Sequence, residues 1–187
     1  MEPNIRQQVR KLIFAASIAG LYAALTFVIA PIAYGAFQFR VSEFLTILPF
    51  FFPLAVPGLF VGCIIANILS PYGFVDMVIG SVATLLAALC TMRLGKSDRS
   101  EYISVKAIAC LPPVLFNAVF VGSLIAYFMV GAGDADNFWT AFVVNALQVG
   151  FGQLVIVYII GLPLMIYLPK MGVIDRLKQL YNRGETK

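Results

Sequence analysis

The sequence predicts an all-α fold, an integral membrane bundle of six transmembrane helices with the N- and C-termini in the cytoplasm. Two observations about composition support this class. Apolar residues make up 61% of the 187 residues and charged residues only 12%, and the mean hydropathy is +0.93. A soluble domain of this length could not bury that much apolar surface, so the solvent must be lipid.

The third observation is the placement of lysine and arginine. Of the 13 such residues, all but Arg40 fall in segments that a six-helix topology places in the cytoplasm. They are Arg6, Arg10, Lys11, Arg93, Lys96, Arg99, Lys106, Lys170, Arg176, Lys178, Arg183 and Lys187. This is the distribution that the positive-inside rule describes. It accounts for the net charge of +4, so we expect the lipid bilayer and no nucleic acid as a partner.

The first half of the chain predicts three helices. The first covers about 12–34, long enough for a hydrocarbon core of ~30 Å. Two short helices are expected at 41–53 and 57–69, joined by a turn at Pro53–Pro57, each reaching only ~20 Å. A single kinked span is the alternative, but it would put the basic loop outside. Short helices would require local thinning of the bilayer or tilting.

The second half predicts three more helices, at about 72–92, 105–130 and 138–168. A turn at Ser70–Gly73 precedes the fourth, a polar cytoplasmic loop joins the fourth to the fifth, and an acidic outer loop precedes the sixth. Pro163 is expected to kink or end the last helix. The tail, 169–187, is predicted to be a basic helix on the inner surface. We expect residues 1–187 to form a single membrane domain. The chain has no clear internal repeat, which argues against a carrier built on inverted repeats.

Arg40 is the exception to the charge rule and the starting point for a functional hypothesis. Ionisable groups at membrane depth are functional candidates by default, and Glu43 and Asp76 lie in the same outer half of the predicted bundle. We therefore predict that Arg40 faces a polar ligand cavity open to the outside. An ion pair with Glu43 that only organises the loop is the alternative for Arg40.

Amide and aromatic side chains complete the predicted site. The amides are Asn67, Asn117, Asn145, Gln148 and Gln153. Each offers a donor and an acceptor together, which suits the edge of a purine-like ring. Phe39 and Tyr72 could stack on such a ring. Bridging between helices is an equally good interpretation of any single amide, and anchoring at the lipid interface is the alternative for Tyr72.

Small residues repeat every four positions on the first helix, at Ala15, Ala19 and Ala23. Such a face lets another helix approach closely, either inside the bundle or from a partner, and the spacing does not separate the two. We expect no metal and no cofactor, because histidine is absent and the three cysteines lack metal-site spacing.

Several segments carry a resemblance to a known family. They are Gln38-Phe39-Arg40-Val41-Ser42-Glu43 with Leu45, Leu48 and Pro49; Pro57-Gly58-Leu59-Phe60 with Gly62 and Asn67; Asp76 with Gly80-Ser81 and Thr84-Leu85; Leu111-Pro112-Pro113 with Phe116-Asn117; and Gly161-Leu162-Pro163-Leu164. In this order they resemble the QueT family, whose proteins are substrate-binding S components of energy-coupling factor (ECF) transporters. The family often has Gly-Glu where this chain has Gly152-Gln153, a difference that would remove a charge and alter selectivity.

The resemblance implies a non-enzymatic S component of a prokaryotic cell membrane that captures a queuosine precursor of the 7-deazaguanine type. It also implies a transmembrane scaffold subunit (EcfT), on which Ala15, Ala19 and Ala23 would dock, and two ATPase subunits (EcfA and its paralogue). Three alternatives stay open. They are an S component for another small vitamin-like molecule, an autonomous proton-coupled carrier, and a membrane enzyme that uses Asp76 and Glu43 as an acid–base pair.

Overall fold

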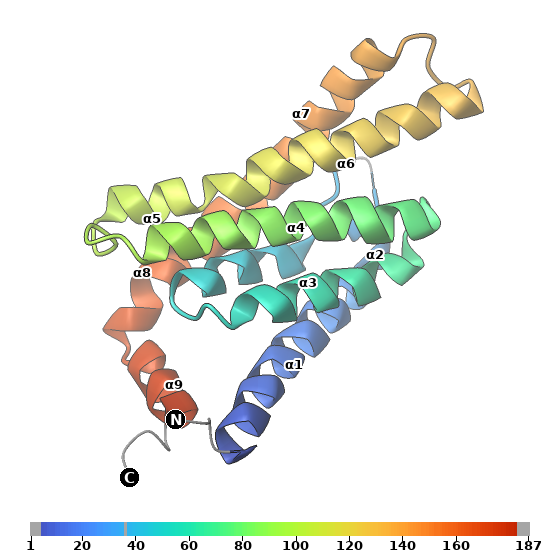
Figure 1. Ribbon diagram of the computed structural model, residues 1–187. Coiled ribbons are helices and arrows are strands. Elements are labelled where there is room, and N and C mark those ends of the chain that lie inside the picture. Colours follow the sequence, from blue (N-terminus) through green and yellow to red (C-terminus); the bar gives the residue numbers. More distant parts are fainter. Residues whose placement is uncertain (1–4, 36, 183–187) are drawn as a thin grey trace.

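The computed structural model describes residues 5–35 and 37–182, and within them every regular element is a helix (Figure 1). The helices are α1 (Ile5–Val28), α2 (Ala30–Ala33), η1 (Val41–Phe50), α3 (Ala55–Ala66), η2 (Asn67–Leu69), α4 (Gly73–Gly95), α5 (Ile103–Ala109), α6 (Leu111–Ala132), α7 (Phe138–Ile156), η3 (Val157–Gly161), α8 (Leu162–Lys170) and α9 (Val173–Asn182). The expected tail helix lies in α9, and residues 183–187 are outside the described part.

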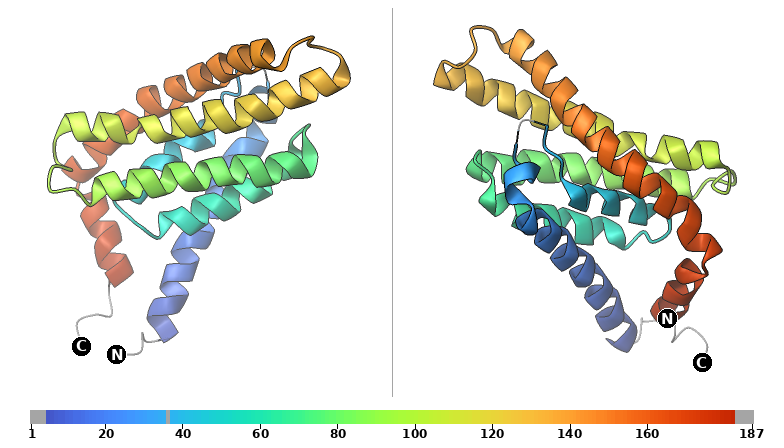
Figure 2. Two further views of the ribbon diagram at one scale, coloured as in Figure 1. Left: turned by 45° about the horizontal axis from the view of Figure 1, so that its top comes forward. Right: turned by 180° about the vertical axis from the view of Figure 1, so that it is seen from behind.

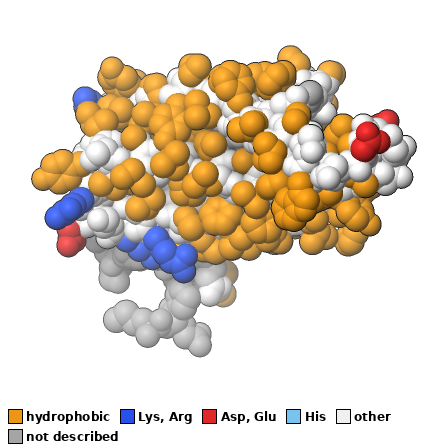
Figure 3. Space-filling view, turned by 90° about the horizontal axis from the view of Figure 1, so that it is seen from above, with side chains coloured by type: hydrophobic (Ala, Val, Ile, Leu, Met, Phe, Trp, Pro, Cys, Tyr) orange, Lys and Arg blue, Asp and Glu red, His pale blue; other side chains and the backbone are white. Residues whose placement is uncertain are grey.

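Four helical stretches are long and apolar enough to cross a membrane, namely Ile5–Val28, Gly73–Gly95, Ile103–Ala132 and Phe138–Lys170. Apolar side chains cover most of the face seen from above, and charged side chains gather at its two ends (Figure 3). An exposed apolar surface of this kind is the arrangement of a membrane bundle. The chain therefore folds as an all-helical, multi-pass membrane protein.

The segment expected as a helix at 41–53 is a 3-10 helix, η1, which ends at Phe50. Two local features favour the tighter winding. The Thr46 hydroxyl donates to the Glu43 carbonyl oxygen at 2.6 Å, and Pro49 has no N–H for an α-helical hydrogen bond. Because a 3-10 helix rises ~2.0 Å per residue, ten residues extend ~20 Å, further than an α-helix of equal length.

The C-terminal long helix changes its winding in the middle. Between α7 and α8 the residues Val157–Gly161 form a π-helical turn, and Pro163 follows in the first turn of α8. Proline lacks the N–H that a continuous α-helix would use, and its ring needs space in the preceding turn. The wider π turn is a common way to accommodate such a break. Pro163 therefore coincides with a change of winding, and the helix continues to Lys170.

The small residues of α1 pack inside this chain. A Cβ added at Gly62 of α3 would lie 2.9 Å from the Ala19 carbonyl oxygen, and Ala19 and Ala23 are each 5% exposed. The stripe expected to dock on a partner thus contacts α3, and Ala15 is half-buried beside it. The neighbouring stripe, Ala16, Gly20 and Ala24, is exposed. Docking of a partner on α1 stays a prediction, and the exposed stripe is the face left for it.

One end of the bundle is basic and is closed by α9. This helix packs against α1 and α8, so the start of α1 and α9 lie on the same side in both views of Figure 2. Ile174, 3% exposed, is the buried anchor of α9 in the apolar core. Lys96, Lys106 and Lys178 line a single cavity at this end. We call it the basic end.

Candidate functional site

Polar side chains from six segments meet in the half of the bundle away from the basic end. We define this polar cluster as Tyr22, Arg40, Glu43, Asn67, Ser70, Asp76 and Asn117, joined by the contacts described below. Asp76 lies in the first turn of α4, and the last residue of α4 is Gly95 at the other end. At 1.5 Å per residue, that places Asp76 ~30 Å from the basic end along α4.

Glu43 of η1 is fully buried at one side of the cluster. The Tyr22 hydroxyl of α1 donates to its Oε1, and the side chains of Asn117 and Thr84 lie beside the carboxylate. Within the described residues, Oε2 of Glu43 and Nδ2 of Asn117 make no hydrogen bond. The carboxylate is therefore fixed through one oxygen and leaves the other available.

Arg40, at the start of η1, faces Asp76 of α4. Its Nη2 lies 3.7 Å from Asp76 Oδ2, and its guanidinium lies over the Tyr34 ring, 5.1 Å from the ring centre. The Ser70 hydroxyl donates to the same Oδ2 at 2.5 Å. Arg40 Nε and Nη2 and Asp76 Oδ1 have no hydrogen-bond partner among the described residues. The sequence offered an ion pair between Arg40 and Glu43 as an alternative, but in the structure the ion-pair partner of Arg40 is Asp76.

Asn67 connects the short η2 helix to α4. Its amide donates to the Asp76 carbonyl oxygen at 2.9 Å. A Cβ at Gly80, one turn further along α4, would lie 2.7 Å from the Asn67 amide nitrogen and 2.8 Å from Asp76 Oδ1. Because only glycine leaves room for the side chains of Asn67 and Asp76, Gly80 is required for this arrangement of the cluster.

The loop before η1 holds Arg40 in place by packing on α7. A Cβ at Gly152 would overlap the Phe37 carbonyl oxygen, so the loop backbone touches α7 directly. Gln38 is buried and adopts a positive φ of 45°, an uncommon conformation for a residue other than glycine. Phe39 packs against Phe37 and Phe151, with ring centres 5.9 Å and 6.4 Å apart.

The structure brings five of the ten residues predicted for substrate binding into the polar cluster: Arg40, Glu43, Asn67, Asp76 and Asn117. Gln153 is buried on α7, one residue after the loop contact, with Oε1 unpartnered among the described residues. Gln148 is half-buried on the same helix, Phe39 lies in the loop, and Tyr72 packs against Phe128 at 5.2 Å between ring centres.

Asn145 lies apart from the polar cluster. Its amide donates to the Ala141 carbonyl oxygen at 2.8 Å and approaches Met129 Sδ at 3.3 Å. It lines a cavity of about 340 Å³ together with Asp136 and Asn137, where the α6–α7 loop joins the two helices. Asn145 thus bonds within α7 and bridges to α6, as expected for a structural amide.

Sequence reasoning missed Tyr22, Tyr34 and Ser70. Tyr22 follows Ile18 by four residues on the buried face of α1, and Thr26, a further four residues on, shares a hydrogen bond of 2.7 Å with Ser42. This i, i+4 spacing of polar groups on a face of small residues was the available signal. Tyr34 donates to the Ala66 carbonyl oxygen at 2.5 Å, which ties the loop to α3.

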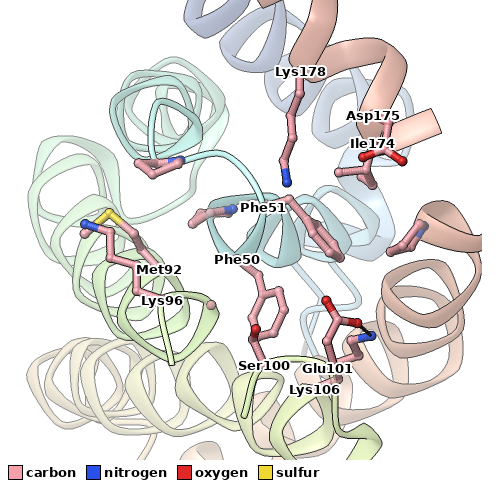
Figure 4. A pocket seen from close by; sticks show the side chains of 14 residues that line it. Phe50, Phe51, Met92, Lys96, Ser100, Glu101, Lys106, Ile174, Asp175 and Lys178 are labelled. Carbon is pink, nitrogen blue, oxygen red and sulfur yellow. Dashed lines mark ion pairs between the residues drawn. The ribbon is translucent and has the colours of Figure 1, made fainter. Parts of the chain in front are cut away.

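A cavity of about 370 Å³ opens at the basic end, outside the polar cluster (Figure 4). In the figure, Lys178 extends toward Phe51, and Glu101 pairs with Lys106 at 3.7 Å. Glu101 is largely exposed, so this pair is only partly shielded from water. The cavity lacks the unpartnered buried atoms that distinguish the polar cluster within the described residues. We therefore do not take it as the ligand site.

Unpartnered buried atoms are the strongest sign of a ligand site here. Within the described residues they are Arg40 Nε and Nη2, Glu43 Oε2, Asn67 Oδ1, Asp76 Oδ1, Ser81 Oγ, Asn117 Nδ2 and Gln153 Oε1. A buried polar group without a partner costs about 1–3 kcal/mol, more for a charged group. Most of these atoms belong to the polar cluster, and a bound polar molecule could satisfy several of them at once. No group of three or more metal-ligating residues is present in the described parts of the chain.

Comparisons with known proteins identify the family. The QueT transporter family matches residues 12–170. A protein of Lactococcus lactis subsp. cremoris (strain MG1363), described as the queuosine precursor transporter QueT, is 40% identical over 73 residues, which are 38% of this chain and 43% of that protein. The match thus spans less than half of this relative's length. No solved structure matches the chain. Because the family match covers most of the sequence, including every residue of the polar cluster, the chain belongs to the QueT transporter family.

Proposed function

We propose that this chain is the substrate-capture (S) subunit of an ATP-driven ECF importer and binds a queuosine precursor of the 7-deazaguanine type in the polar cluster. The observation that carries the proposal is the set of buried, unpartnered donors and acceptors contributed by η1, η2, α4 and α6. Flat heterocycles with N–H donors and a carbonyl acceptor are complementary to carboxylate, amide and guanidinium groups.

The proposal includes a topology of six crossings in a prokaryotic cell membrane with both termini in the cytoplasm. The shared cavity places the α4–α5 loop and α9 at one end, where basic residues favour the cytoplasmic side. The exposed residues Asp134 and Asp136 lie in the α6–α7 loop. Counting η1 and α3 as two short crossings, in addition to the four long helical stretches, gives six and returns the chain to its starting side.

ATP hydrolysis is assigned to two partner ATPase subunits, and docking to a scaffold subunit through α1. The resemblance to S components supports this assignment, and the exposed stripe Ala16, Gly20 and Ala24 offers a close-packing surface. Uptake of the substrate into proteoliposomes tests whether transport is driven by ATP hydrolysis or by a proton gradient. We expect transport only when scaffold, ATPases and ATP are present. Uptake by this chain alone under a proton gradient would instead favour the autonomous carrier.

Two matched amide variants test the site. Asn117→Ala removes an amide whose Nδ2 is unpartnered beside Glu43, whereas Asn145→Ala removes an amide that already donates to Ala141 and Met129. Titration of the purified protein with 7-deazaguanines should show at least tenfold weaker binding for Asn117→Ala and nearly unchanged binding for Asn145→Ala. Equal effects of the two variants would remove the polar cluster from the ligand site.

A second titration separates the substrate alternatives. The same protein is titrated with riboflavin, folate, biotin and thiamine. We expect binding of deazaguanines alone. Tighter binding of a vitamin would support an S component for another small molecule, and conversion of a bound compound by the isolated chain would support the membrane enzyme.

A further inference from the structure

We infer that the cavity at the basic end binds the phosphate group of an anionic phospholipid. This is a second site, ~30 Å along α4 from Asp76, and it does not depend on the substrate of the polar cluster. The inference starts from three lysines that reach one cavity from three separate segments. Lys96 follows α4, Lys106 lies in α5 and Lys178 lies in α9.

Lys106 is the buried member of this set. It is 7% exposed, and its Nζ lies 3.7 Å from Glu101 Oε2, further than the ~2.7–2.9 Å of a charge-assisted hydrogen bond. The Glu101 side chain is 92% exposed, so water screens the pair. Burial of an ammonium group is costly unless the group is paired and hydrogen-bonded. An anion in the cavity would give Lys106 a closer partner.

The other two lysines add positive charge to the cavity. Among the described residues, Lys96 and Lys178 have no ion-pair partner, and Figure 4 shows Lys178 extending toward Phe51 inside the ring of lining residues. The lining also includes two carboxylates, Glu101 and Asp175, both of which are exposed to solvent. Three lysines against two carboxylates leave a surplus of positive charge, which an anionic ligand would neutralise.

The segments around the cavity extend this positive field. Residues 93–106 and 170–178 hold seven basic and three acidic side chains. The positive-inside rule explains why basic residues gather at one end of a membrane protein. It does not require three of them to line one cavity, or Lys106 to be buried there. A binding site for an anion accounts for both observations.

The level of the cavity in the membrane favours a lipid over a soluble compound as the source of the phosphate. The 23 residues of α4 extend ~34 Å, enough to cross a hydrocarbon core of ~30 Å, so Lys96 lies at the level of the headgroups. Tyr102, Ile103 and Met171, close in sequence to the lining residues, are 61–69% exposed apolar side chains that acyl chains can cover. Basic pockets between membrane helices bind anionic headgroups.

The cavity also has the size and the donors for a headgroup. Its volume of about 370 Å³ lies within the ~300–1,000 Å³ of small-ligand sites. Ser100 lines it as well, and its hydroxyl can donate to a phosphate oxygen. A phosphate held there would contact the α4–α5 loop, α5 and α9 together. We therefore expect the bound lipid to hold α9 against the bundle.

Titration of the full chain with three phosphate compounds tests the inference. Protein in neutral detergent receives dioctanoyl phosphatidylglycerol (anionic), dioctanoyl phosphatidylcholine (zwitterionic) or sodium phosphate, and native mass spectrometry measures the bound fraction. We expect phosphatidylglycerol to bind at least tenfold more tightly than phosphatidylcholine, and an equal concentration of sodium phosphate not to displace it. Equal binding of the two lipids would overturn the inference. Displacement by sodium phosphate would overturn the assignment to a lipid and indicate a site for soluble phosphate.

Two variants of α9 locate the binding. Lys178→Gln removes a lysine that lines the cavity, whereas Arg176→Gln removes an equal charge from an exposed residue of the same helix outside the lining. Lys178→Gln should weaken phosphatidylglycerol binding at least fivefold, and Arg176→Gln should leave it near the wild-type value. Equal weakening by both would overturn binding in the cavity and indicate diffuse attraction to the basic end.

The proposed effect on α9 has its own measurement. Phosphatidylglycerol should slow the removal of α9 by chymotrypsin, which does not cut at lysine or arginine, in the wild type and in Arg176→Gln but not in Lys178→Gln. Lys96→Gln, which changes the lining outside α9, should lose the same protection. Protection that persists in both lysine variants would overturn the inference.

Discussion

Removing the Tyr22 hydroxyl tests whether the polar cluster is held together as described. Tyr22→Phe deletes one oxygen from a fully buried residue and keeps the ring that packs between α1 and α3. The loss leaves the Glu43 carboxylate, 0% exposed and already unpartnered at Oε2, without its hydroxyl donor. The perturbation is thus confined to a single hydrogen bond to a buried charged group.

The expected magnitude follows from the charge of the acceptor. A hydrogen bond to a charged group contributes about 1.5–3 kcal/mol, and one between neutral groups about 0.5–1.5 kcal/mol. Tyr158→Phe is the matched control, because the Tyr158 hydroxyl donates at 2.9 Å to the neutral Ala107 carbonyl oxygen. Tyr22→Phe should therefore reduce the free energy of unfolding by roughly twice as much as the control.

The assay is unfolding of the ligand-free protein in detergent micelles, followed by circular dichroism. Repeating the Tyr22 change in a Glu43→Gln background makes the acceptor neutral, so the cost of Tyr22→Phe should fall to that of Tyr158→Phe. A cost for Tyr22→Phe no larger than that of the control, or the same cost in both backgrounds, would refute a buried hydrogen bond from α1 to a charged carboxylate on η1.

Three further predictions concern other parts of the structure. Asp76→Asn leaves Arg40 without its ion-pair partner and should lower stability by about 3–5 kcal/mol, whereas exposed Asp136→Asn should change it little, as measured by chemical unfolding. Gly152→Ala forces a Cβ onto the Phe37 carbonyl and should cost about 1–3 kcal/mol and weaken ligand binding, while Gly131→Ala, with open space around it, should not. Ile174→Ala should release α9 and speed its removal by limited proteolysis, with ligand affinity unchanged; protection equal to wild type would contradict the anchor.

The sequence was sufficient to find the charged members of the polar cluster. Arg40, Glu43 and Asp76 stand out because ionisable groups are rare in apolar helices, and Asp76 lies opposite Arg40 although 36 residues separate them by numbering. The partner of Arg40 was not predicted. A local ion pair three residues away was the simplest expectation, and the actual pairing depends on how α4 is placed beside η1.

Residues of one type with opposite roles could not be separated from sequence. Asn117 and Asn145 are both buried amides in apolar helices. Asn117 keeps an unpartnered Nδ2 beside Glu43, whereas the Asn145 amide donates to Ala141 in its own helix and to Met129 of α6. The difference depends on how α6 and α7 are rotated about their own axes. Because both helices are apolar on all sides, their sequences do not indicate which face is turned inward. The same uncertainty applied to Ala19 and Ala23, whose face turned out to pack on α3.

The most direct test of the account is a structure of the protein with 7-aminomethyl-7-deazaguanine bound, determined in lipid nanodiscs. Polar atoms of the base should lie within hydrogen-bond distance of Glu43 Oε2 and Asp76 Oδ1, the acceptors now unpartnered in the described residues. Density for the base in the cavity at the basic end beside Lys106 and Lys178, with the polar cluster unchanged, would contradict it.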